Sequence, residues 1–230
     1  MIGVVAAVLA LFRDTIDFKI GPAADTPNAA SISTANPAPS AGDNSDNYGW
    51  GPMREMYTRK EASPTAVFNS IVDNPVWGDE RNYVRCRIMN DPNRDFVDEV
   101  AIRDDTELSV VVFIDDSSVR ADQAIRGARM DLLIDPNPSI NPALNVFLTG
   151  DNVIREWNGC KILSASPTTL SYIPGTAFLN IYGTPPIAVM DSVIRGDTLL
   201  PGVRGNAEGV IGGDPQIYGY IEFRVQAFVD

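Results

Sequence analysis

The segment QIYGYIEFRVQAFVD (216–230) alternates between apolar and polar side chains over almost its whole length. Side chains of a β-strand point alternately to its two faces, so this pattern predicts a long strand with one face in a core. The core-facing set is Ile217, Gly219, Ile221, Phe223, Val225, Ala227 and Val229, and the opposite set is Tyr218, Tyr220, Glu222, Arg224 and Gln226. No other stretch constrains the fold as strongly.

Shorter apolar or alternating runs recur from residue 48 onward, separated by turn-forming stretches such as NDPNRD, DPNPSINP and IPGT. They predict further strands at residues 66–72, 82–89, 107–114, 125–134, 143–149, 153–164, 168–173 and 176–182. No sustained helical period follows residue 20. Many short strands without intervening helices imply an all-β, antiparallel sandwich or barrel.

The N-terminal part of the chain has a different composition. Residues 1–13 (MIGVVAAVLALFR) are apolar almost throughout, but a helix of about 12 residues spans only about 18 Å, against a hydrocarbon core of about 30 Å. We predict a truncated transmembrane or signal-anchor segment that begins upstream, with a buried N-terminal helix or strand as the alternative. Residues 14–47 are rich in Pro, Ala, Ser and Asn and predict a disordered tether, which leaves residues 48–230 as the folded body.

Composition excludes several kinds of chemistry. The chain has no histidine, which removes Ser-His-Asp and Cys-His catalysis and histidine-ligated zinc. A net charge of −12 argues against nucleic acid as a partner. The two cysteines, Cys86 and Cys160, are too few for a four-thiolate metal site. They permit one disulfide in an oxidising compartment, and two buried free thiols are the open alternative.

Charged residues are concentrated in GDERNYVRCRI (78–88). In an extended strand one face would carry Arg81, Tyr83, Arg85 and Arg87, and the opposite, core-facing side would carry Val84, Cys86 and Ile88. Three guanidiniums and a phenol on one face are suited to an anionic polymer such as a teichoic acid or an acidic glycan. The alternative, which the thirty carboxylates of the chain favour, is cross-strand pairing of these arginines with Asp or Glu.

Two pairs of carboxylates suggest other chemistry. Asp79 and Glu80 raise the possibility of a glycosidase, but adjacent strand residues point to opposite faces and make a poor facing pair. Asp115 and Asp116, in IDDSS, suggest a calcium loop, but the alternating acidic spacing and terminal Glu of an EF-hand are missing. We therefore expect solvated turns there, no metal or other cofactor, and no enzymatic activity.

Several phrases resemble a known family when taken in order. NYGWGPMREMYTRKEAS (47–63) followed by VFNSIVDNPVWGDERNYVRCRI (67–88) is similar to the opening of a group of uncharacterised actinobacterial surface proteins. LSVVVFIDDSSVRADQAIRGARMDLLI (108–134) and the last strands resemble the family called domain of unknown function eleven. The resemblance covers residues 48–230 and implies an extracellular, immunoglobulin-like β-sandwich. Cys86 departs from it, because the related segment usually has an aliphatic residue there.

These observations together predict a non-enzymatic, membrane-anchored module on the extracellular face of a cell envelope, acting as a spacer or an adhesion domain. Its partners would be envelope components or another surface protein, with the membrane reached through the N-terminal segment. The alternatives are a module that binds carbohydrate or an anionic envelope polymer, and an envelope glycoside hydrolase. The tryptophans discriminate: Trp50, Trp77 and Trp157 gathered on an exposed face would favour glycan binding, and burial would favour a spacer.

Overall fold

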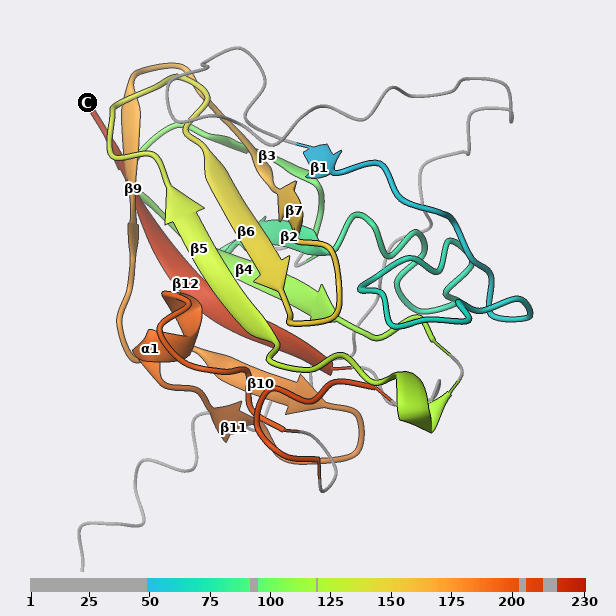
Figure 1. The fold of residues 1–230 in the computed structure, drawn as a ribbon. Coiled ribbons are helices and arrows are strands. Elements are labelled where there is room, and N and C mark those ends of the chain that lie inside the picture. Colours follow the sequence, from blue (N-terminus) through green and yellow to red (C-terminus); the bar gives the residue numbers. More distant parts are fainter. Residues whose placement is uncertain (1–48, 92–94, 119, 203–205, 213–218) are drawn as a thin grey trace, which may run out of the picture.

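The structure is a computed structural model, and it describes residues 49–91, 95–118, 120–202, 206–212 and 219–230. The predicted anchor segment 1–13 and tether 14–47 lie outside the described residues, as do Ile217 and Tyr218 at the start of the last predicted strand. The described residues form an all-β sandwich of predominantly antiparallel strands, which confirms the predicted class (Figure 1).

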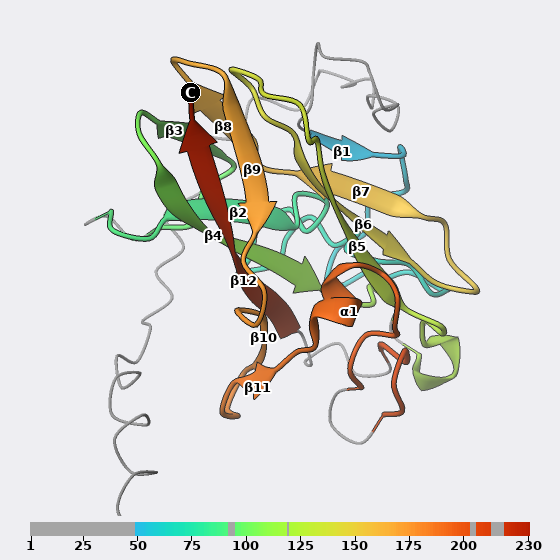
Figure 2. The ribbon, with the colours of Figure 1, turned by 90° about the vertical axis from the view of Figure 1, so that its left-hand side faces the viewer.

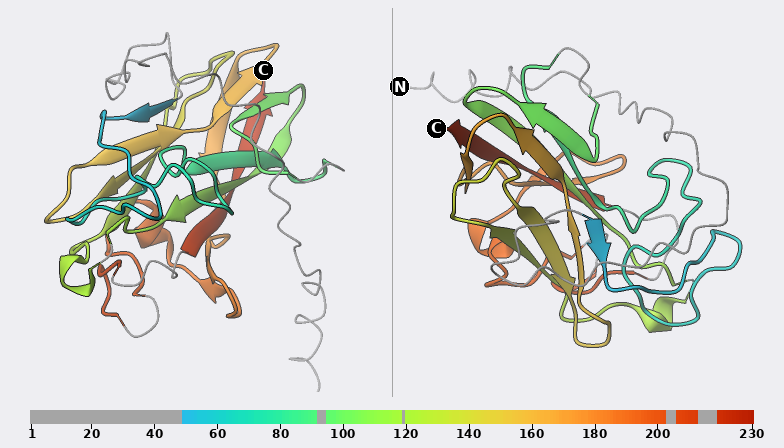
Figure 3. Two further views of the ribbon diagram at one scale, coloured as in Figure 1. Left: turned by 90° about the vertical axis from the view of Figure 1, so that its right-hand side faces the viewer. Right: turned by 90° about the horizontal axis from the view of Figure 1, so that it is seen from above.

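Two sheets make the two layers of the sandwich, as Figure 2 shows. The four-stranded sheet has the order β1 (Gly49–Gly51), β7 (Glu156–Gly159), β6 (Leu144–Thr149), β5 (Arg129–Ile134). The six-stranded sheet contains β11 (Ile187–Ala188), β10 (Phe178–Ile181), β12 (Gly219–Val229), β4 (Thr106–Ile114) and β2 (Val84–Ile88), with β9 (Thr168–Tyr172) also paired to β12. A parallel pair, β3 (Glu99–Ile102) with β8 (Lys161–Ser164), lies at one end of the sandwich (Figure 3).

The strand β12 is the centre of the six-stranded sheet. It pairs with β4 along most of its length, with Arg224 opposite Ser109. On its other side it pairs first with β10 and then with β9. Its alternation is as predicted over residues 220–227, because Ile221, Phe223, Val225 and Ala227 are fully buried and Tyr220, Glu222, Arg224 and Gln226 are partly exposed.

The core lies between the two sheets and is built mostly from aliphatic side chains. The two layers contribute fully buried residues from β4, β5, β6 and β12, among them Val110, Val112, Met130, Val146, Leu148, Ile221 and Val225. Their β-branched and apolar side chains suit the pleated inner faces, and burial of this surface is the main stabilising contribution. The outline of the sandwich thus follows from the alternating pattern of the sequence.

Residues 52–82 depart from the prediction, because they form a long irregular segment rather than containing a strand at 66–72. The segment packs over the end of β4 and makes only single bridges, such as Phe68 with Asp116. Asn69 has a φ of 39°, and hydrogen bonds of its side chain take the place of a backbone strand ladder. Its Nδ2 donates to the Phe113 carbonyl at 3.0 Å, and its Oδ1 accepts from the Asp115 backbone N–H at 2.8 Å.

Other short elements were not predicted from the sequence. The strands β1 and β3 have three and four residues, too few to show a clear alternation. Two single turns of helix complete the described elements, η1 (Ala121–Gln123) and α1 (Asp191–Ile194). The carboxylate of Asp191 in α1 accepts hydrogen bonds from the Tyr172 hydroxyl and the Gly175 backbone N–H, which fixes this turn beside β9.

Candidate functional site

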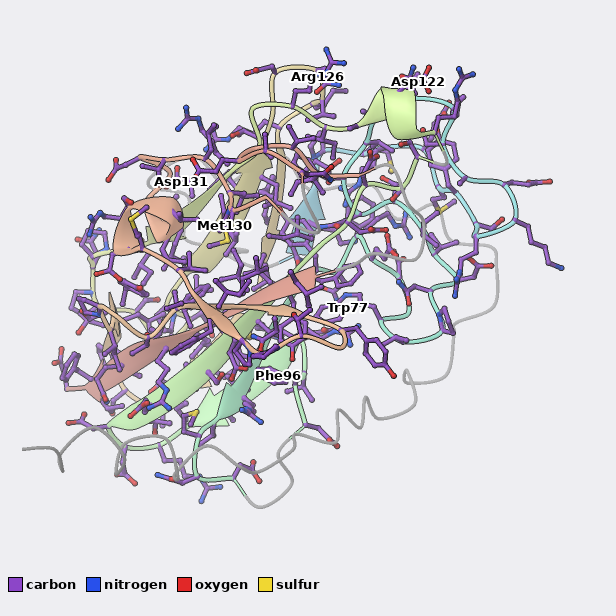
Figure 4. The ribbon with its side chains drawn as sticks, turned by 90° about the horizontal axis from the view of Figure 1, so that it is seen from below. Trp77, Phe96, Asp122, Arg126, Met130 and Asp131 are labelled. Carbon is purple, nitrogen blue, oxygen red and sulfur yellow. A yellow bond between two sulfur atoms is a disulfide. The ribbon has the colours of Figure 1, made fainter. Side chains whose placement is uncertain are left out.

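Arg85 and Arg87 lie on β2, and both are matched with aromatic rings and carboxylates. Each guanidinium lies 4.4 Å from a ring centroid, Arg85 over Trp77 and Arg87 over Phe96. Arg85 also faces Asp98 at 3.3 Å, and Arg87 faces Glu222 at 3.1 Å. Figure 4 shows Trp77 and Phe96 beside the six-stranded sheet. The two arginine side chains are only 13% and 14% exposed, so this face is neutralised by local partners.

Arg81 lies before β2, in the turn that follows the Trp77-Gly78 pair. Its guanidinium donates to both oxygens of Asp79 and stacks 4.4 Å from the ring centroid of Trp50. Arg54 approaches the same ring at 5.4 Å. Trp50 is partly exposed, and two guanidiniums therefore contact the ring of this β1 residue.

Tyr83 does not share a face with the arginines, and this prediction was wrong. The side chain is fully buried, and its hydroxyl donates to the Val146 carbonyl of β6 at 3.0 Å. The reason is that β2 begins only at Val84, so the alternation of the strand does not extend back to Tyr83. Burial raises the pKa of the Tyr83 phenol well above its ordinary value. Tyr83 is therefore a link between the two sheets.

Cys86 and Cys160 form a disulfide, with a Cα–Cα distance of 6.1 Å. Cys86 is in β2 of the six-stranded sheet, and Cys160 directly follows β7 of the four-stranded sheet. Both residues are buried, as the parity argument predicts for Cys86. The bond therefore fastens one layer of the sandwich to the other.

A buried ion pair lies near Tyr83. The Nη2 of Arg54 faces the Oε2 of Glu156 at 3.1 Å, with side chains only 6% and 1% exposed. Burial raises the pKa of Glu156 to about 8, although the positive charge of Arg54 opposes that rise. Sequence reasoning missed Glu156, although it shares the parity of Cys160 and Ile162 in the predicted strand 153–164, and both of these are buried.

Three further carboxyl groups are buried where residues 52–82 meet the end of β4. Glu80, Asp115 and Asp116 are 1%, 9% and 3% exposed. The prediction that Asp115 and Asp116 belong to solvated turns was therefore wrong. The turn-forming sequence IDDSS gives no sign of what covers it, since the covering segment lies far away in the sequence. We call these three residues the acidic cluster.

The acidic cluster is hydrogen-bonded by neutral donors. Glu80 Oε1 accepts from the Asn74 side chain at 2.6 Å, and Glu80 Oε2 accepts from the Ser117 hydroxyl at 3.4 Å. Asp116 accepts from the backbone N–H and the hydroxyl of Ser118, both at 3.0 Å. Neutral donors satisfy the carboxyl oxygens but do not compensate a buried negative charge.

The pKa values of the acidic cluster follow from this environment. Burial raises the pKa of Asp116 to about 6 and that of Glu80 to about 7. Burial also raises the pKa of Asp115 well above its ordinary value, and the nearby charges of Glu80 and Asp116 raise it further. These raised pKa values mean that the carboxyls of the cluster bind protons more readily than exposed carboxyls do.

The tryptophans are distributed between the interior and the surface. Trp77 and Trp157 are buried, whereas Trp50 is partly exposed. Trp77 stacks on Phe113 with a centroid distance of 4.9 Å, and its Nε1 donates to the Asn82 carbonyl at 2.9 Å. The three rings therefore do not form an exposed aromatic platform.

Asp79 and Glu80, the adjacent carboxylates, have different surroundings. Asp79 is 38% exposed and pairs with Arg81, whereas Glu80 is buried in the acidic cluster. A separate open hollow of about 540 Å³ lies at the opposite end of the sheets, lined by Arg103, Asp104, Asp105, Ser166, Val229 and Asp230. Its acidic side chains would suit a small cationic or polar ligand.

The described part of the chain contains neither a metal-binding cluster nor a membrane-spanning helix. Within it, no group of three or more His, Cys, Asp or Glu side chains could hold a metal ion. Over the same residues, no helix is long and apolar enough to cross a bilayer. Comparison with known protein families, with curated proteins and with solved structures finds no match to this chain.

Proposed function

We propose that the chain is a non-enzymatic module of a cell surface, which acts as a spacer or an adhesion domain. In this proposal the apolar segment 1–13 belongs to a membrane anchor, and residues 14–47 tether the sandwich outside the cell. Its partners would be envelope components or another surface protein. The resemblance of residues 48–230 to the actinobacterial surface family supports the same location.

The disulfide between Cys86 and Cys160 is the observation that carries the proposal. Disulfides persist in oxidising compartments, and they are rare in the cytosol. This one joins two layers that would otherwise be held only by packing and hydrogen bonds, so it suits a body that must stay folded outside the cell. It also supports the finer assignment of an immunoglobulin-like sandwich, because a disulfide between the two sheets is characteristic of that group.

Burial of Trp77 and Trp157 supports a spacer rather than a glycan-binding module. Sites for sugars use exposed aromatic rings as platforms, and here two of the three indoles serve the interior. Stiffness is what a spacer requires, and the buried indoles, the disulfide and the bond from Tyr83 to Val146 all contribute to it.

An anionic envelope polymer is the second candidate ligand. Partly exposed Trp50, with Arg81 against its ring, is the observation that favours it. The polymer would have to displace Asp79 from Arg81, as well as Asp98 and Glu222 from Arg85 and Arg87. We call Arg81, Arg85 and Arg87 the arginine face. This competition makes polymer binding to the arginine face a weaker proposal than the spacer, and an envelope hydrolase is weaker still.

The location is tested by labelling cells that produce the full chain. An external protease should degrade the sandwich on intact cells, and a membrane-impermeant maleimide should label it only after reduction. Cytosolic protein with two reactive thiols would contradict the proposal. Lysed cells provide the control for protease access.

The choice between spacer and polymer binder is tested by a binding screen of the full chain against envelope glycans and teichoic acids. A spacer should bind none of them above the level of an inert protein. Salt-sensitive binding that is lost in Arg85→Gln/Arg87→Gln, and retained in the exposed control Arg195→Gln, would replace the spacer proposal with the polymer binder.

A further inference from the structure

The acidic cluster joins two segments that are distant in the sequence. Glu80 belongs to the irregular segment 52–82, and Asp115 and Asp116 follow the end of β4. Besides the side-chain bonds already described, the Ile71 N–H donates to Glu80 at 3.3 Å and the Val67 N–H donates to Asp116 at 3.4 Å. The cluster therefore contributes directly to holding the segment in place.

The charges around the cluster do not balance it. Among the ion pairs of the described residues, none includes Glu80, Asp115 or Asp116. Arg59, which lowers the pKa of Asp115, is exposed and has the smallest of the effects on it. Asp79 adds a further negative charge beside Glu80.

Apart from Arg59, no cation among the described residues is one of the charges that act on the cluster. On η1 and the residue before it, Arg120 and Asp122 pair with each other at the surface, and Figure 4 shows Asp122 at the outside of the molecule. The loop at 206–212 brings backbone close to Asp116, since a Cβ on Gly212 would collide with the Asp116 carboxyl group. Buried carboxylates without a cation are costly, and protonation removes that cost.

We propose that the acidic cluster is a proton-dependent latch, which holds residues 64–82 against the end of β4 while its carboxyls are protonated and releases them when the protons leave. Released, the segment exposes Phe68 and Trp77, two buried aromatic side chains. The surface of the module would then differ between acidic and alkaline surroundings, with no change in the two sheets.

The direction follows from linkage. The folded-state pKa values of about 6 for Asp116 and about 7 for Glu80 lie above those of exposed carboxyls. The closed state therefore binds more protons than the open state, and its stabilisation is complete below about pH 4. That stabilisation is lost as the pH rises through about 6 and 7.

Hydrogen–deuterium exchange of the full chain at pH 5.5 and pH 8.5, corrected for intrinsic exchange rates, tests the latch. Protection of peptides from residues 64–82 should fall between the two conditions, by about tenfold for each pH unit between 5.5 and the closed-state pKa of a group, which is about 6 for Asp116 and about 7 for Glu80. Peptides from β4 and β12 serve as the internal reference and should keep their protection. Equal protection of residues 64–82 at both pH values would overturn the proposal.

Variants assign the effect to the cluster. Glu80→Gln keeps the shape of the side chain but cannot ionise, so its segment should stay more protected than the wild type at pH 8.5. Glu61→Gln is the control, because Glu61 is an exposed residue of the irregular segment 52–82 that lies outside residues 64–82, and this variant should behave as the wild type does. If Glu80→Gln loses protection with pH as strongly as the wild type, the latch lies elsewhere and the proposal fails.

A measurement on the unmodified chain covers the case in which Glu80→Gln does not fold. Infrared difference spectra should show the carbonyl stretch of protonated carboxyl groups persisting at pH 6, with more intensity than the single carboxyl of Glu156 (pKa about 8) can supply, and decreasing as the pH is raised to 8.5. Complete loss of that band by pH 5, where exposed carboxyls are ionised, would also overturn the latch.

Discussion

The interior between the two sheets and the end of the molecule under residues 52–82 are both buried, but different interactions stabilise them. Between the sheets, side chains such as Val112, Val146 and Phe223 pack without any polar requirement. Under residues 52–82, Asn69 and the acidic cluster depend on individual hydrogen bonds. Apolar packing is nondirectional, whereas a buried hydrogen bond fails when either partner is removed.

Stability and sensitivity to pH are therefore located in different parts of this chain. Among the described residues of the apolar interior, Glu156, at its edge with Arg54, is the carboxyl whose pKa burial raises, to about 8. The end under residues 52–82 has Glu80 and Asp116, with pKa values of about 7 and about 6, and Asp115, whose pKa is raised well above its ordinary value. The effects of substitutions on the free energy of unfolding should therefore differ between the two regions, both in size and in their dependence on pH.

Phe223→Ala should have the largest effect. The ring is fully buried in β12 and meets Tyr172 edge to face at 5.9 Å. Its removal should lower the free energy of unfolding by about 3–5 kcal/mol in urea denaturation, with little dependence on pH. Phe228→Ala, on the exposed side of the same strand, is the matched control and should cost less than about 1 kcal/mol. Similar losses for the two variants would disprove the assignment of the core face.

The double variant Cys86→Ala/Cys160→Ala should have the second-largest effect on the free energy of unfolding. The bond closes a loop over a sequence separation of 74 residues, so its loss should lower the free energy of unfolding by about 2–4 kcal/mol. The expected result is a lower denaturation midpoint that matches that of reduced wild-type protein. An unchanged midpoint in both samples would mean that the bond does not constrain the unfolded chain.

Asn69→Ala should have a smaller effect, confined to the polar end. It leaves the Phe113 carbonyl and the Asp115 N–H without their side-chain partner, at a cost of about 1–3 kcal/mol. Exchange protection should fall in residues 64–82 before it falls in β4. Asn137→Ala, in an exposed turn, is the control and should change neither quantity. Global loss of protection in Asn69→Ala would show that the two regions unfold as one.

Arg87→Gln should have the smallest effect of the four. Its ion pair with Glu222 is partly shielded, and the expected loss is about 1 kcal/mol, reduced at high salt. Arg195→Gln removes an exposed pair with Asp197 and should be close to neutral. If both substitutions are neutral, the pair of Arg87 with Glu222 does not stabilise the sandwich.

The sequence predicted the sandwich well because its strands carry their own pattern. The alternation at 219–229 and the apolar run at 107–114 correspond closely to β12 and β4, which pair with each other. Parity also placed Cys86 correctly on the buried side of β2. Alternation predicts burial here because successive residues of a strand point to opposite faces of the sheet, so that the local sequence shows which face is buried.

The candidate site could not be predicted in the same way. Residues 66–72 look like a strand, but Asn69 replaces the ladder with side-chain bonds to residues more than forty positions away. Asp115 and Asp116 have the composition of a surface turn and become buried only because residues 52–82 cover them. Tyr83 was misplaced because the strand begins one residue later. Each case depends on contacts that no local pattern encodes.

The position of β12 has a consequence for how the protein folds. This strand is central in the six-stranded sheet, yet it follows every other described strand in the chain. During synthesis or export, one edge of β4 therefore remains unpaired until the segments from β5 to β11 have emerged and β12 can pair with it. Pairings of such high sequence separation form slowly, and an open apolar edge is prone to aggregation. Val110–Phe113 is the stretch of β4 that a chaperone or a rapid export route would have to protect.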